Sequence, residues 1–91
     1  MFSGGSYEEV TRWLRNFLTA HAKRENVRAE VELEAGDGAS YVARVRLGTR
    51  VSGAIDCSYP EVAENRGSLV WCADLAARVR EVVRDLVIAA A

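Results

Sequence analysis

The chain has 91 residues, of which 49% are hydrophobic and 27% are charged. This composition is typical of one globular domain and excludes a chain dominated by disorder. Twelve basic and thirteen acidic residues leave a formal net charge of −1, which excludes a global electrostatic attraction to nucleic acid or anionic lipid. No apolar run approaches the roughly 20 residues of a membrane-spanning helix.

The domain organisation that we expect is simple. A flexible N-terminus at 1–5 precedes a single α+β domain at 6–91. The first residues contain no basic stretch followed by an apolar run, so we expect no signal peptide and a cytoplasmic location.

The first predicted helix spans 7–22. Ser6 and Glu9 form a capping-box pattern at its start. An apolar face then follows at helical spacing, which predicts a helix with one buried side. The residues of this face are Val10, Trp13, Leu14, Phe17 and Leu18.

Three strands are predicted after this helix, at 27–35, 40–47 and 50–57. Apolar and charged residues alternate along them, which is typical of half-buried strands. Turn signals at 36–38 and 48–49 separate them. Gly53 and Ala54 are poor strand formers, so a bulge at Gly53 is the alternative to a regular third strand. The inward positions are Val27, Ala29, Val31, Leu33, Ala35, Tyr41, Ala43, Val45, Leu47, Val51, Gly53, Ile55 and Cys57.

The end of the chain predicts a short helix near 60–65 and a long one over 68–89. Ser68 can cap the long helix. Its apolar residues recur at the spacing of a buried stripe. The residues on this side are Trp71, Cys72, Leu75, Val79, Val82, Val83, Leu86 and Val87.

This element order predicts an α+β fold with the sequence α-β-β-β-α, in which a three-stranded antiparallel meander carries both long helices on one face. The outward strand positions are charged, so only the other face can be covered. Glu30 and Glu32 should lie opposite or diagonal to Arg44 and Arg46. The expected core is Val10, Trp13, Leu14, Phe17, Val31, Leu33, Val45, Ile55, Leu75, Val79, Val82 and Leu86.

Residues with catalytic potential are few. His21 is the only histidine, and we favour a half-buried ring that satisfies the last helix carbonyls over a base near Cys57. Cys57 and Cys72 have no redox or metal-ligand spacing and are expected to be buried and unreactive. We therefore expect no enzyme, no cofactor and no metal site.

Some residues are candidates for binding anions or nucleic acid: Arg44, Arg46, Arg50, Arg66 and Ser68. The element order is similar to that of double-stranded-RNA-binding domains, which depend on lysines at the start of the last helix. Here 68–74 is apolar and ends in Asp74, and glutamates alternate with the arginines of the sheet. We therefore expect no strong binding to duplex RNA or DNA.

The expected function is a non-enzymatic protein-interaction module, adaptor-like or chaperone-like, that forms a homodimer. Similar element orders occur in small dimeric adaptor and secretion-chaperone folds. The alternative is a nucleic-acid-binding domain that uses the arginines of the open sheet face. The expected dimer contact is the uncharged edge of the third strand, because small side chains let a second copy approach. This edge is Val51, Ser52, Gly53, Ala54 and Ile55.

Overall fold

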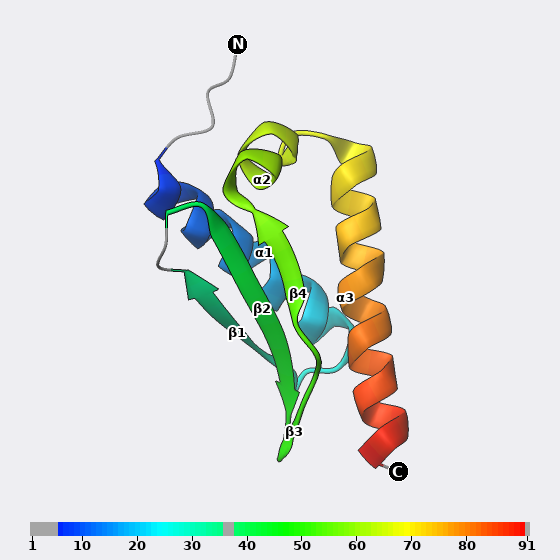
Figure 1. Ribbon diagram of the computed structural model, residues 1–91. Coiled ribbons are helices and arrows are strands. Elements are labelled where there is room, and N and C mark those ends of the chain that lie inside the picture. The colour runs from blue at the N-terminus through cyan, green and yellow to red at the C-terminus, as the bar shows by residue number, and fades with distance from the viewer. Residues whose placement is uncertain (1–5, 36–37, 91) are drawn as a thin grey trace.

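The computed structural model describes residues 6–35 and 38–90 and confirms the α+β fold. The predicted N-terminal segment 1–5, turn residues 36–37 and Ala91 lie outside the described residues. The elements, shown in Figure 1, are α1 (Tyr7–Glu25), β1 (Glu30–Ala35), β2 (Ser40–Leu47), β3 (Arg50–Val51), β4 (Ile55–Ser58), α2 (Tyr59–Asn65) and α3 (Leu69–Ala90).

A serine side chain caps the start of each helix. In each case the serine hydroxyl accepts a hydrogen bond from a backbone amide three residues later, which satisfies one of the free donors of the first turn. The pairs are Glu9 to Ser6 at 3.2 Å, Glu61 to Ser58 at 3.2 Å and Trp71 to Ser68 at 3.3 Å. The predicted helix starts are thereby confirmed.

The first strand begins later than its alternation predicts. The Asn26 side chain accepts a hydrogen bond from the Arg28 amide at 2.9 Å, and the Asn26 carbonyl accepts one from Ala29 at 3.0 Å. These local bonds form a turn that competes with strand pairing. Val27 is consequently 77% exposed, so its inward placement is wrong, whereas Ala29 is buried.

The third strand is split into β3 and β4 by a bulge, so a regular strand over 50–57 is wrong. Ala43 of β2 lies opposite Ile55, and Arg46 lies opposite Val51. The two β2 residues between these pairs therefore face three residues, 52–54, on the other strand, which is the register of a one-residue bulge.

The extra residue changes which side chains face the core. Beyond the bulge Val51 lies on the same face of the sheet as Arg46, and it is 50% exposed instead of pointing inward. Ile55 and Cys57 keep the inward phase and are buried. A single inserted residue thus reverses the facing of one segment, because side chains alternate along a strand.

The core lies between the sheet and the two long helices. Seven predicted core residues are buried: Val10, Leu14, Val45, Ile55, Leu75, Val79 and Leu86. Trp13, Phe17, Val31, Leu33 and Val82 pack around them and are half-buried. The expected core omitted several buried residues, among them Leu18, Tyr41, Val62, Ala76 and Val83. Val87, placed on the apolar side of the last helix, is 40% exposed.

The two long helices share the buried side of the sheet. In Figure 1, α1 crosses behind the strands and α3 runs alongside β4. α3 packs against α1 and also contacts β2 and β3. Trp13 and Trp71 bring their rings to 6.4 Å across the helix contact. No helix in the described part of the chain is both long and apolar enough to cross a membrane.

Candidate functional site

The arginines of the open sheet face are paired with glutamates. Arg46 contacts Glu30 and Glu32 at 3.1 Å each, and Arg44 contacts Glu34 at 2.5 Å. These cross-strand contacts confirm the predicted opposition of the acidic first strand and the basic second strand. The pairs neutralise the charges that a nucleic-acid phosphate would need.

The other anion-binding candidates lie apart from this face. Arg50 belongs to β3, whereas Arg66 lies at the opposite end of the molecule, between α2 and α3 (Figure 1). Arg66 lines a shallow hollow together with the acidic side chains of Glu8 and Glu9. The Ser68 hydroxyl is used to cap α3. The five candidates are therefore not brought together.

The predicted dimer edge is not a continuous strand. The Ser52 amide donates to the Val45 carbonyl at 2.8 Å, and the Ser52 hydroxyl accepts from the Val45 amide at 2.9 Å. Ile55 is buried, and Gly53 and Ala54 are exposed at the bulge. The edge thus offers a second copy only short, interrupted lengths of strand.

His21 is half-buried beside Phe17, with 4.5 Å between the ring centroids. Its Nδ1 atom is buried and has no hydrogen-bond partner among the described residues, so the expected bond to the last helix carbonyls is wrong. Burial, followed by the nearby charges of Arg24 and Arg80, lowers the pKa of His21 below its usual 6.5. The ring is therefore held in its neutral form near pH 7.

The two cysteines are free thiols. Burial, followed by the charge of Glu61, raises the pKa of Cys57, with Arg78 opposing the shift. The Cys72 thiol lies 3.5 Å from the Arg66 carbonyl, to which it donates, and burial raises its pKa as well. Thiols with raised pKa values carry little nucleophilic thiolate at neutral pH.

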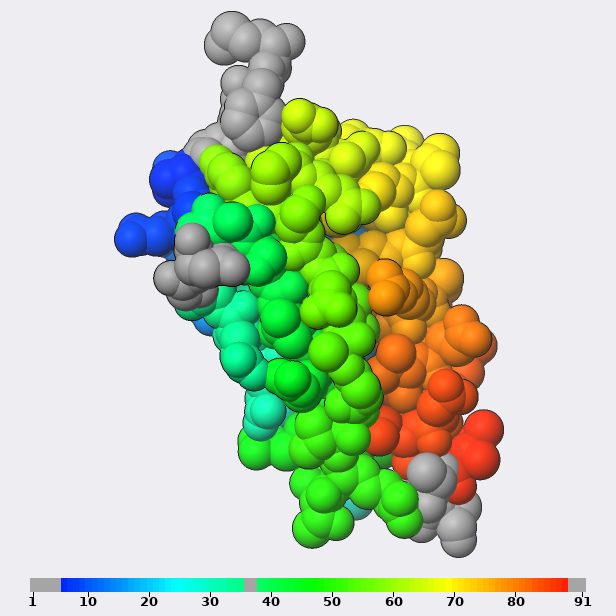
Figure 2. All heavy atoms as spheres, viewed as in Figure 1, coloured from blue at the N-terminus to red at the C-terminus, as the bar shows by residue number. Residues whose placement is uncertain are grey.

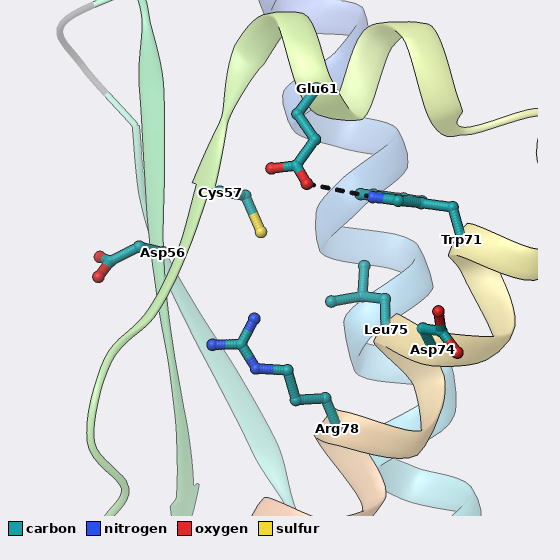
Figure 3. Close-up of a pocket in the computed structure, with 7 residues that line it drawn as sticks. All are labelled: Asp56, Cys57, Glu61, Trp71, Asp74, Leu75 and Arg78. Atoms are coloured by element: carbon teal, nitrogen blue, oxygen red, sulfur yellow. Dashed lines mark hydrogen bonds between the residues drawn. The ribbon is translucent and has the colours of Figure 1, made fainter.

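A hollow of about 240 Å³ lies between β4, α2 and α3. It is lined by Asp56, Cys57, Glu61, Trp71, Asp74, Leu75 and Arg78 (Figure 3). Of these residues, sequence reasoning considered only Cys57 as a source of chemistry. The others come from three elements, and nothing in their order along the chain indicates that they meet.

The local structure of each element directs its side chains to the hollow. The i, i+3, i+4, i+7 spacing of Trp71, Asp74, Leu75 and Arg78 places them on one side of α3. Glu61, in the first turn of α2, accepts a hydrogen bond from Trp71 Nε1 at 3.4 Å. This contact orients the indole along the wall of the hollow (Figure 3).

Acidic groups outnumber basic ones around the hollow. Asp56, Glu61 and Asp74 are the acidic residues that line it, and Arg78 is the single basic one. The Asp56 carboxylate points away from the hollow in Figure 3, so Asp56 borders it with its backbone. Figure 3 shows the Arg78 side chain reaching across the hollow toward β4. Arg78 forms no ion pair within 4.0 Å with any described residue. Its charge is therefore available to rearrange when another charged group enters.

This hollow has a neighbour along the same strand–helix boundary. A second hollow of about 190 Å³ is lined by Ser52, Gly53, Val82, Asp85 and Leu86. Both hollows lie where the edge formed by β3 and β4 meets α3, along the boundary between the green and the orange segments in Figure 2. We call the residues lining the two hollows the strand–helix groove.

The edge of β4 that faces this groove has unpaired backbone groups. The Tyr59 amide donates to the Ala39 carbonyl at 2.8 Å, so that pair is hydrogen-bonded. Hydrogen-bonded and non-hydrogen-bonded pairs alternate along an antiparallel ladder. Asp56, opposite Val42, therefore belongs to a non-hydrogen-bonded pair, and its amide and carbonyl point away from β2.

The described residues contain no group of three or more histidine, cysteine, aspartate or glutamate side chains suited to a metal ion. Comparisons with protein-family models, curated proteins and solved structures give no match. Any functional assignment therefore depends on the geometry of the strand–helix groove.

Proposed function

We propose that this protein is a cytoplasmic, non-enzymatic interaction module, adaptor-like or chaperone-like, that binds an extended segment of a partner protein in the strand–helix groove. The observation that carries the proposal is the outward-facing backbone of Asp56 beside a groove floored by α3. An extended segment that pairs with an open strand edge gains affinity from main-chain hydrogen bonds, and side-chain pockets add specificity.

The chemistry of the groove supports binding better than catalysis. Cys57 is the only nucleophile in the hollow near α2, and its pKa is raised. His21 does not line either hollow, so no base is placed to activate the thiol. Trp71 and Leu75 instead offer apolar surface of the kind found in binding pockets.

The test uses a phage-displayed library of random heptapeptides, with the purified protein as bait. We expect selected peptides to bind in the micromolar range and to lose binding when alternate backbone amides are N-methylated, because N-methylation removes strand pairing. Asp56→Pro should abolish binding, since it removes the outward amide, whereas Asp56→Asn should retain it. Equal binding by both variants would place the contact elsewhere.

Self-association is part of the proposal, with the outer face of α3 as the contact. The bulge at 52–54 gives the β3–β4 edge less support as a dimer contact than a regular strand would. Val70 and Ile88 are each 73% exposed and lie about five turns apart on one side of α3. An antiparallel two-fold contact would bury Val70 of each copy against Ile88 of the other.

Light scattering during size-exclusion chromatography tests this association. A dimer mass at tens of micromolar is expected, and Val70→Lys with Ile88→Lys should convert it to a monomer. Ala54→Lys, which alters the strand edge at an exposed position, should leave the dimer intact. A monomer mass for the unaltered protein contradicts the dimer, and an edge variant that dissociates it would restore the edge as the contact.

The alternative function, nucleic-acid binding through Arg44, Arg46, Arg50 and Arg66, has weaker support. Arg44 and Arg46 already contact glutamates. Retention on duplex RNA or DNA that weakens steeply with added salt would favour this alternative.

A further inference from the structure

We infer that the strand–helix groove selects extended segments carrying a lysine or arginine, whose side chain enters the hollow formed by β4, α2 and α3. This inference rests on the proposed function, because it names the chemistry of the partner bound at that site. The occupant is a basic segment of another protein.

The open β4 edge determines where such a segment lies. A strand added beside β4 would pair with the outward amide and carbonyl of Asp56. It would run above the side of α3 that lines both hollows. Alternate side chains of the added strand would then point down toward α3, within reach of the hollow.

The charges along this path favour a cation. Asp56, Glu61 and Asp74 border the first hollow, and Asp85 borders the second. Arg78 is the only basic residue among the residues that line either hollow. In Figure 3 the Glu61 side chain points into the hollow from α2 and Asp74 lies on α3 beside Leu75, whereas the Asp56 carboxylate points away from the hollow. Glu61 and Asp74 are therefore the acids that an incoming cation would meet.

The shape of the hollow suits a long side chain with an apolar stem. Trp71 and Leu75 provide apolar surface against which methylene groups can pack. The Trp71 indole, held by Glu61, presents a π-system close to a carboxylate. A cation at this position would gain both an ion pair and a cation–π contact.

The thiol of Cys57 adds a weak, uncharged hydrogen-bond acceptor to the hollow. It is 7% exposed, it points into the hollow in Figure 3, and it has no hydrogen-bond partner among the described residues. Its raised pKa keeps it uncharged at neutral pH. A sulfur atom is a weak acceptor and can receive an N–H from an ammonium or guanidinium group.

The same charges argue against a second copy in this groove. A two-fold pairing of β4 with β4 would bring two Asp56 side chains and two acidic hollows together. Like charges placed opposite each other across strands are destabilising. A basic segment of another protein avoids this repulsion.

We expect the Arg78 side chain to move when a basic side chain enters the hollow. Its guanidinium reaches across the hollow, and Asp74 lies one turn before it on α3. An incoming cation would displace it from the hollow. Removing its charge should therefore strengthen binding of a basic peptide.

Fluorescence anisotropy with labelled heptapeptides tests the inference. The probes are Thr-Val-Thr-Lys-Thr-Val-Thr and the same peptide with norleucine or glutamate in place of lysine. We expect the lysine peptide to bind about tenfold more tightly than the norleucine peptide, and the glutamate peptide to bind most weakly. Arg78→Gln should increase the affinity for the lysine peptide a few-fold.

The matched variants are Glu61→Gln with Asp74→Asn, which neutralises the hollow, and Glu81→Gln, which removes an acid of α3 outside the groove. The first should abolish the preference for lysine, and the second should leave it unchanged. Circular dichroism and thermal unfolding confirm that each variant is folded.

The outcomes separate the two proposals. If lysine and norleucine peptides bind equally, and N-methylation still abolishes binding, the basic selectivity is overturned while the interaction module stands. If no probe binds and the heptapeptide library yields no binder, both proposals are overturned. A lysine preference that persists in the Glu61 and Asp74 variant also overturns the assigned pocket.

Discussion

The two edges of the sheet differ in how they are protected from other chains. β1 pairs regularly with β2 over its six residues, and its glutamates form ion pairs with Arg44 and Arg46. The other edge is split by a bulge and flanked by α3. Charge protects the first edge along its whole length, whereas the bulge and α3 leave only a short part of the second edge open.

The difference between the two edges bears on the proposed function. A charged, solvated edge discourages pairing without creating a pocket. An interrupted edge beside a helix leaves a short length of backbone open at the bottom of a groove, where the backbone of Asp56 faces the side of α3 that carries Trp71. A narrow, extended segment of the kind proposed above would fit such an opening.

The largest expected effect on stability is that of introducing a charge at a buried position instead of an exposed one. Val79 is fully buried, so Val79→Asp should destabilise the protein by about 3–5 kcal/mol or prevent folding. Val51 lies opposite Arg46 on the solvent side, so Val51→Asp should change stability by about 0.5 kcal/mol or less. Urea denaturation measures both. A severe effect of Val51→Asp would indicate that Val51 points inward, as it would in a regular third strand.

A smaller effect is expected at the bulge. Ser52→Ala removes the hydroxyl that accepts from the Val45 amide, and an unsatisfied buried amide costs about 1–3 kcal/mol. Thr49→Ala, in the exposed turn nearby, is the matched control and should change little. If the two variants unfold at the same urea concentration, the Ser52 side chain does not hold the bulge.

The solvated charges of the sheet contrast with the half-buried ring of His21. Because burial lowers the pKa of His21 in the folded state, the unfolded chain binds a proton more readily. Its contribution to stability is complete above the usual pKa of 6.5 and is lost as the pH falls from there toward the folded-state pKa. His21→Leu should flatten this part of the stability profile. If the free energies of unfolding of the two proteins change in parallel between pH 7 and about pH 5, the lowered pKa of His21 is contradicted.

The smallest effect belongs to the charged edge. Arg46→Gln removes the contacts with Glu30 and Glu32, and exposed ion pairs contribute about 1 kcal/mol or less. The loss should shrink in high salt, because counterions screen surface charges. Arg50→Gln, on the exposed β3, serves as the control. A salt-independent loss would show that Arg46 acts through packing.

Local patterns predicted the elements well where the deciding interactions lie within a few residues. Ser6, Ser58 and Ser68 mark the helix starts, because a cap uses only a side chain and the next turn. The prediction failed at Val27, where the Asn26 side chain formed a turn in a segment that alternates like a strand. Alternation alone cannot tell when local hydrogen bonds will displace pairing.

The sequence by itself determined the α+β order, the buried side of each long element and the acid–base opposition of the first two strands, because these follow from periodicity and charge. Only the tertiary structure decided the bulge and the strand–helix groove. A bulge depends on the register between β2 and its neighbours, and the groove requires Asp56, Glu61 and Trp71 to meet from three elements. Such meetings are set by packing between distant segments, which no local pattern encodes.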